Sequence, residues 1–180
     1  MARAYADTVM IEGTTLSEGR GTTRPLEALF GAPDVDANAV LEEMHGLAPE
    51  WLSGCVLREC WFEPRFHKHS GELCNALMIH AEGPHYEHAS FRPWRLQALA
   101  FKAIRNIYRD YEIWRDFPYE YELDRLAIDV INGGPGLREW VDDPLAEPGF
   151  VRALFDEYKG LAPRVKDQAA KKALKFYMDE

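Results

Sequence analysis

The strongest periodic pattern in this sequence lies between Pro93 and about Arg109. Its apolar residues recur every three or four positions, the spacing that places them on one face of an α-helix. They are Leu96, Leu99, Ala100, Ala103, Ile104 and Ile107. Pro93 suits the first helical turn, where a backbone N–H has no partner within the helix. The chain is therefore expected to contain an amphipathic helix that covers an apolar surface elsewhere in the protein.

Two earlier segments alternate in the manner of β-strands. Neither side of residues 54–62 is cleanly polar, which is typical of a strand inside a sheet. Residues 73–80 form the second strand, and alternate positions there share one face. These positions are Leu73, Asn75, Leu77 and Ile79. The polar stretch 63–72 is too long for a tight hairpin and is predicted to be a loop.

Shorter signals complete the prediction of the fold. The apolar run 8–11 predicts a buried strand, Pro25 opens a short helix over 26–30, and Asp36 caps a helix that runs to Met44. Further helical patterns lie at 136–141, 148–158 and 164–177. These elements predict an α+β fold in which several helices pack on a small sheet, in a single domain over residues 1–180.

Charge and composition argue against several classes of protein. Asp and Glu outnumber Lys and Arg by 30 to 21, a net charge of -9 that repels phosphate backbones, so no nucleic-acid partner is expected. The three cysteines form no disulfide framework. No segment approaches the roughly 20 apolar residues that span a bilayer, and the first 13 residues do not resemble a signal peptide. No membrane partner is expected, and the sequence leaves the compartment open.

The run TTLSEGRGTT at residues 14–23 is the first candidate binding segment. Gly19 and Gly21 let the backbone bend on both sides of Arg20, and hydroxyl groups surround this guanidinium. Such a loop is expected to be exposed and suits a polyhydroxylated or acidic ligand. The alternative is a structural loop in which the hydroxyls cap the next helix and Arg20 pairs with Glu12 or Glu18.

A second candidate segment runs from Phe66 to His80. Its possible metal ligands are His67, His69, Cys74 and His80. Their spacing matches no strong zinc pattern, so neither a metal nor another cofactor is expected. A role in facing a ligand is more plausible for His69 or Asn75.

Two further segments are assigned mainly to the scaffold. Residues 85–94 are interpreted as a connector into the helix at Pro93, and the aromatic residues at 114–121 as core rather than as sugar-stacking rings. No nucleophile elbow, P-loop or dinucleotide motif occurs. A glycosidase needs two carboxyl groups that flank the scissile bond, and the sequence alone identifies no such pair.

The segment from Ile11 to Glu27, IEGTTLSEGRGTTRPLE, and the motif FGAP at 30–33 resemble the opening of the C-terminal domain of NamZ-type exo-β-N-acetylmuramidases. The likeness continues through FHKHSGELCN at 66–75 and covers nearly the whole chain. Two positions depart from the family pattern, which usually has Asn at Thr15 and a smaller residue at His67. The second departure also argues against a metal at His67.

This resemblance implies a glycoside hydrolase that removes N-acetylmuramic acid from the non-reducing end of peptidoglycan fragments. It implies an additional Rossmann-like N-terminal domain that carries the catalytic carboxylate, and enzymes that are often exported from bacterial cells. The partners would be a muramyl sugar and that N-terminal domain. The alternative is a stand-alone, non-catalytic carbohydrate-binding or structural domain.

The resemblance also implies which residues would contribute to a cleft between the two domains. The candidate substrate-binding residues are Glu12, Thr14, Ser17, Arg20, Thr22, Thr23, His69 and Asn75. Arg20 is the candidate for the lactyl carboxylate of the sugar, because a guanidinium can bind a carboxylate through two nitrogens. Phe30, Trp61 and Phe66 are expected to expose an apolar surface toward the missing domain.

Overall fold

A computed structural model describes residues 3–4, 8–115 and 141–143 of the 180-residue chain. The chain divides into two compact units, Met1–Arg115 and Asp116–Glu180, and the account below concerns the first. The apolar run at 126–131, the helical patterns at 148–158 and 164–177, and nearly all of the pattern at 136–141 lie outside the described residues.

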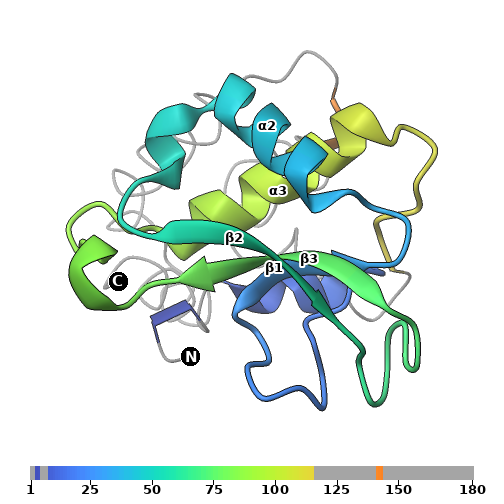
Figure 1. Ribbon diagram of the computed structural model, residues 1–180. Helices are drawn as coiled ribbons and strands as arrows, with labels where there is room; N and C mark the ends of the chain where they lie inside the picture. Colours follow the sequence, from blue (N-terminus) through green and yellow to red (C-terminus); the bar gives the residue numbers. More distant parts are fainter. Residues whose placement is uncertain (1–2, 5–7, 116–140, 144–180) are drawn as a thin grey trace, which may run out of the picture. The chain divides into compact units, whose positions relative to one another are not determined.

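The first unit is built on a three-stranded antiparallel sheet of β1 (Ala28–Ala32), β2 (Val56–Phe62) and β3 (Cys74–His80), in the order β1-β3-β2 (Figure 1). The register pairs Trp61 with Asn75 and Cys60 with Ala76. Both alternating segments of the sequence therefore form strands, as predicted. Within the described residues only β3 has a strand on each side, so the expectation that residues 54–62 lie inside a sheet was wrong for this part of the chain. As an edge strand, β2 keeps several residues partly or fully exposed.

Two helices, α2 (Ala37–Leu47) and α3 (Pro93–Ile107), pack against each other and cover one face of the sheet (Figure 1). Asp36 caps α2 as predicted, because its Oδ1 accepts the backbone N–H groups of Asn38 and Ala39 at 2.8 and 3.0 Å. The apolar stripe of α3 is buried from Leu96 to Ile104. With the sheet on one side and helices on the other, the fold is α+β.

Two predicted elements near the N-terminus were wrong. The run 8–11 lies in η1, a 3-10 helix over Val9–Gly13, because a short apolar run does not distinguish a strand from a buried helical turn. The segment predicted as a helix after Pro25 instead leads into β1. Leu26 has a φ of 62°, which no helix accommodates, and all five residues of β1 are buried against neighbouring elements. Tertiary packing therefore overrides the local helical signal.

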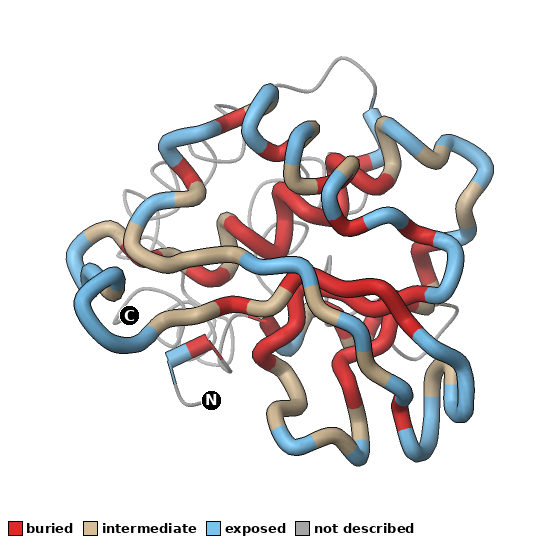
Figure 2. Tube along the Cα trace, viewed as in Figure 1, coloured by how far each residue is buried: buried red, intermediate tan, exposed pale blue. Residues whose placement is uncertain are grey.

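The core lies between the sheet and the two helices, and includes Phe30, Met44, Leu77 and Phe101 (Figure 2). Trp114 is buried and meets Phe101 edge to face at 5.8 Å, so its assignment to the core is confirmed. The other aromatic residues of 114–121 lie outside the described residues. Within the described part of the chain, no helix is long and apolar enough to cross a membrane.

Candidate functional site

The segment 14–23 forms an irregular loop, but the expectation that it is exposed was wrong for its first half. Thr14, Ser17 and Glu18 are at most 1% exposed. The backbone N–H of Ser17 donates to the carbonyl oxygen of Gly31 at 2.8 Å, which ties the loop directly to β1. A polar segment can be buried in this way because its polar groups find partners inside the protein.

Most hydroxyl groups of this loop bind backbone groups, either in the loop or in neighbouring segments such as Glu112, whose carbonyl oxygen accepts from Thr15 Oγ1 at 2.6 Å. Thr14 Oγ1 donates to the carbonyl oxygen of Ile11 at 2.7 Å, and Thr22 Oγ1 donates to that of Gly19 at 2.7 Å. Ser17 Oγ accepts the N–H of Gly19 at 3.1 Å. Thr23 is exposed, and its hydroxyl makes no hydrogen bond to any described residue. These hydroxyls therefore brace the loop, and the prediction that they cap a helix after Pro25 was wrong, because strand β1 follows there instead.

Arg20 lies at the edge of the loop between two carboxylates. Its Nε donates to Glu18 and its Nη2 donates to Glu12, while Nη1 makes no hydrogen bond among the described residues. The Arg20 side chain is 39% exposed, compared with 15% for Glu12 and 2% for Glu18. The hydrogen bond to Glu18 and the two negative charges raise the pKa of Arg20. The guanidinium is thus held in place with one nitrogen directed away from its carboxylate partners.

Lys68 is the residue of this cluster that the sequence analysis missed. Its side chain is only 8% exposed, and its Nζ lies 2.9 Å from Glu18 Oε2. The same Nζ donates to the carbonyl oxygens of Ile11 and Thr14 at 2.9 and 3.2 Å. A lysine in a polar loop is ordinarily solvated. Apart from its place in the FHKHSGELCN motif, nothing in the sequence therefore indicated that Lys68 is buried.

The pKa values of Glu18 and Lys68 reflect two opposing effects, namely the burial of each group and the charge of its partner. Burial alone would raise the pKa of Glu18, but the nearby Lys68 charge and hydrogen bonds from Lys68, the backbone and Arg20 hold this pKa below its usual range. Burial lowers the pKa of Lys68, and Glu18 counteracts part of that effect. A carboxyl group with a lowered pKa is unsuited to act as a general acid, so Glu18 fits a structural or binding role.

Asn75 and the histidines differ in how far they could reach a ligand. Asn75 is buried, with its Oδ1 accepting the N–H of Ala37 at 2.6 Å and its Nδ2 donating to Glu59 at 2.9 Å. His67 and His69 both have positive φ angles in the 63–72 loop, and His67 Nδ1 lies 3.9 Å from Glu18. The His69 side chain is 21% exposed, and its Nε2 has no hydrogen-bond partner in the described structure.

The residues considered as metal ligands do not form a common site. No group of three His, Cys, Asp or Glu side chains placed to hold a metal ion occurs among the described residues. Burial raises the pKa of the Cys74 thiol to about 11, and neighbouring acidic side chains add to this. The thiolate form that binds metals is therefore disfavoured at Cys74.

Two of the three aromatic residues expected at a domain surface are exposed. Trp61 is 58% and Phe66 is 56% exposed, whereas Phe30 is fully buried in β1, so the expectation was wrong for Phe30. Phe66 lies beside the 14–23 loop, because a Cβ placed on Gly21 would come within 3.2 Å of its ring. Phe30 points into the core because β1 is covered on both faces.

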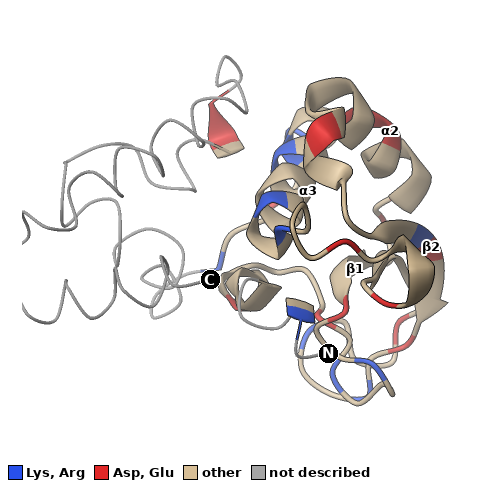
Figure 3. Cartoon of the chain, turned by 90° about the vertical axis from the view of Figure 1, so that its left-hand side faces the viewer, with Lys and Arg blue, Asp and Glu red and all other residues tan. Residues whose placement is uncertain are grey.

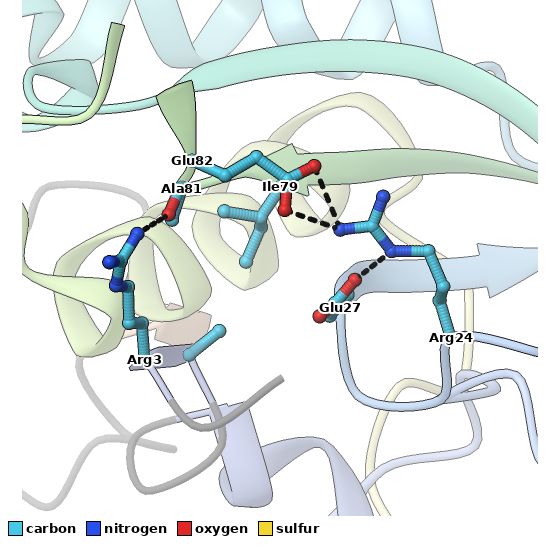
Figure 4. A pocket seen from close by; sticks show the side chains of 7 residues that line it. Arg3, Arg24, Glu27, Ile79, Ala81 and Glu82 are labelled. Atoms are coloured by element: carbon cyan, nitrogen blue, oxygen red, sulfur yellow. Dashed lines mark hydrogen bonds and ion pairs between the residues drawn. The ribbon is translucent and has the colours of Figure 1, made fainter. Parts of the chain in front are cut away.

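A second charged cluster lies at another part of the first unit, around a pocket of about 260 Å³ (Figure 4). Arg24 pairs with Glu27 and with Glu82, and Arg3 donates to the carbonyl oxygen of Ala81 at 2.6 Å. Acidic and basic residues both occur in the loops near the sheet (Figure 3).

The fold and the charged loop together define a small α+β domain that could contribute polar groups to a binding site. Residues 3–159 match the family described as "Exo-beta-N-acetylmuramidase NamZ, C-terminal", and the chain belongs to this family. The segment at 11–27 that carried the resemblance falls inside this match, as does the whole of the described cluster.

Two known proteins show how the chain relates to longer relatives. Peptidoglycan beta-N-acetylmuramidase NamZ of Bacillus subtilis (strain 168) is 35% identical over 149 residues, which cover 83% of this chain and 32% of that protein. A crystal structure of a DUF1343 family protein from Bacteroides fragilis NCTC 9343 matches with a TM-score of 0.64 at 17% identity, over 91% of this chain and 41% of that one. The chain spans about a third of the length of its Bacillus relative.

Proposed function

We propose that this chain forms the C-terminal part of a glycosidase that removes N-acetylmuramic acid from the non-reducing end of peptidoglycan fragments. Membership of the family and the name of the Bacillus relative support the substrate class. Because the chain corresponds to only a third of that relative, the hydrolytic activity is assigned to the longer protein. The catalytic carboxylate is placed in its remaining part.

The observation that carries the proposal is the arrangement of Arg20. N-acetylmuramic acid differs from N-acetylglucosamine by a lactyl group with a carboxylate. Glu12, Glu18, Arg20 and Lys68 carry two negative and two positive charges, so the cluster does not repel an anion. With Nε and Nη2 engaged, Arg20 offers Nη1, and a charge-assisted hydrogen bond from this nitrogen would select the muramyl sugar.

The eight candidate residues would contribute in two ways. Glu12, Arg20, Thr22, Thr23 and His69 keep part of their surface accessible and are proposed to line the ligand. Thr14, Ser17 and Asn75 are buried, and we assign them to shaping the loop and the adjoining helix start. Phe66, beside Gly21, would border the same surface, and with Trp61 it is a candidate contact for the N-terminal part of the enzyme.

Titration of the isotopically labelled chain with N-acetylmuramic acid, followed by NMR, tests the binding role. N-acetylglucosamine is the matched ligand, because it lacks the lactyl carboxylate. We expect shifts centred on residues 12–23 for the first sugar, and about a tenfold weaker affinity for Arg20→Gln. Arg65→Gln is the control variant, since Arg65 is exposed on a neighbouring loop. Equal binding of both sugars would contradict the assignment of Arg20.

A hydrolysis assay tests where the activity is located. The chain alone is expected to release no muramic acid from a chromogenic muramide. A chimera that carries this chain in place of the matching third of the Bacillus enzyme is expected to release it. Turnover by the isolated chain that disappears in Glu12→Gln would instead place the reaction in this domain.

A further inference from the structure

The side chain of Lys68 reaches the 14–23 loop from a different loop of the chain. Its Nζ contacts the backbone near Glu12 and the carboxylate of Glu18, the two residues that hold Arg20. It binds the carbonyl oxygens of Ile11 and Thr14, which flank Glu12 in the sequence. It also meets Oε2 of Glu18, whose Oε1 binds Arg20. One ammonium group therefore contacts the Glu18 carboxylate directly and the backbone on both sides of Glu12.

We propose that Lys68 is a positioning residue that sets the geometry of Arg20 through Glu12 and Glu18 without touching the ligand itself. Its Nζ donates to two carbonyl oxygens at 2.9 and 3.2 Å and forms an ion pair with Glu18 Oε2 at 2.9 Å. A neutral amine could keep the two hydrogen bonds but would lose the charge that faces the Glu18 carboxylate. The 8% exposure of the side chain leaves little surface for contact with a sugar.

Backbone hydrogen bonds alone do not satisfy the groups that Lys68 contacts. They tie the loop to β1 at Ser17 and return the chain at Leu26, whose N–H donates to the Glu18 carbonyl at 2.9 Å. The Ile11 carbonyl also accepts from the N–H and Oγ1 of Thr14, whereas the Thr14 carbonyl accepts from Lys68 Nζ. Without the ammonium, the Thr14 carbonyl would lose this hydrogen bond and the Glu18 carboxylate would lose a buried positive charge, so the loop would rearrange to reach water.

Amide hydrogen exchange of Lys68→Met tests the proposal without any ligand. We expect at least about tenfold faster exchange at Ser17, Thr22 and Leu26, and unchanged exchange at Leu77 in β3. Val40→Ala, a cavity variant in α2, is the control for a general loss of stability. If Lys68→Met fails to fold, Lys68→Arg replaces it: the charge is kept, but the planar guanidinium cannot contact all three oxygens from one nitrogen, so faster exchange in the loop is again expected. Unchanged exchange in the loop, or an equal rise in β3, would overturn the proposal.

Binding of N-acetylmuramic acid gives a second test, which rests on the proposed function. Lys68→Met and Arg20→Gln are each expected to weaken binding about tenfold, and the double variant should be no weaker than either single one. Losses that multiply to about a hundredfold would show that Lys68 acts independently of Arg20, and would overturn the proposal. Absence of binding by the unmodified chain would contradict the proposed function, while the exchange experiment would still decide the role of Lys68.

Discussion

The loops 14–23 and 63–72 are alike in sequence and opposite in structure. Both combine glycine with short polar and charged residues, and both connect strands or lead into one. The first lies against the sheet with Thr14, Ser17 and Glu18 buried, whereas the second exposes most of its residues but sends the charged side chain of Lys68 into the protein. The polarity of a loop therefore does not fix its burial. What decides it is whether its backbone and charged groups find partners inside.

Removing the inward-facing cation should give the largest effect on stability. Lys68→Met would leave Glu18 with a buried charge and one fewer partner, which typically costs about 3–5 kcal/mol of unfolding free energy. Arg65→Met, on the same loop, should change it by less than about 0.5 kcal/mol, because Arg65 is exposed and pairs with Glu63 at 3.4 Å. Urea unfolding measures both variants. Similar losses for the two would show that the buried and exposed ion pairs of this loop do not differ in energy.

A pair of glycines sharpens the comparison further. Gly21 and Gly71 both have a φ of 80°, but a Cβ on Gly21 would lie 2.5 Å from Arg65 Cβ, while one on Gly71 would meet nothing within 4 Å. Gly71→Ala should cost about 1 kcal/mol for its backbone conformation alone. Gly21→Ala should cost about 1–3 kcal/mol more, because two backbone segments must separate. Thermal or urea unfolding of both single variants isolates the contribution of loop packing.

The difference between the loops also shows which parts of the fold a sequence can predict. The strands at 54–62 and 73–80 and the helices after Asp36 and Pro93 carry periodic apolar positions or a cap, and all four were correctly predicted. The segments at 8–13 and 25–32 are short and apolar, and both have long-range partners: Lys68 binds the Ile11 carbonyl, and β1 pairs with β3 and lies beside Phe62. Phe62, for example, occupies the space beside Gly31 that a side chain would fill. Such long-range contacts leave no local pattern.

The candidate site was predictable only in part for a similar reason. Arg20 and its pairing with Glu12 or Glu18 followed from the glycines and the nearby carboxylates. Lys68 did not, because its partners lie 50 or more residues away in the sequence. Asn75 was expected near a ligand, but its amide links β3 to the start of α2. A buried amide and an exposed one have the same sequence signature.

A smaller effect is expected in the pH dependence of the unfolding free energy, through Glu18 in the buried half of the 14–23 loop. The pKa of Glu18 is lower in the folded protein than its usual value, so its charge stabilises the fold above about pH 4.3 and this contribution is lost as the pH falls through the lowered pKa. Glu18→Gln should therefore reduce the slope of unfolding free energy against pH below about 4.5. Equal slopes for Glu18→Gln and the unmodified chain would contradict the buried pair.

Adjacent hydroxyls at Thr22 and Thr23 provide the smallest test, at the point where the 14–23 loop passes from buried to exposed. Thr22 Oγ1 and the Thr22 N–H both donate to the carbonyl oxygen of Gly19, at 2.7 and 3.1 Å, and close a turn around Arg20. Thr22→Ala should cost about 0.5–1.5 kcal/mol, and Thr22→Ser, which keeps the hydroxyl, should cost less. Thr23→Ala should remain within about 0.5 kcal/mol, since Thr23 is exposed. Urea unfolding of the three variants gives the ranking, and a loss at Thr23 as large as at Thr22 would place the boundary of the buried half further along the loop.

The same two positions can be compared by ligand binding. Because the turn fixes the backbone on both sides of Arg20, Thr22→Ala should weaken binding of N-acetylmuramic acid more than Thr23→Ala.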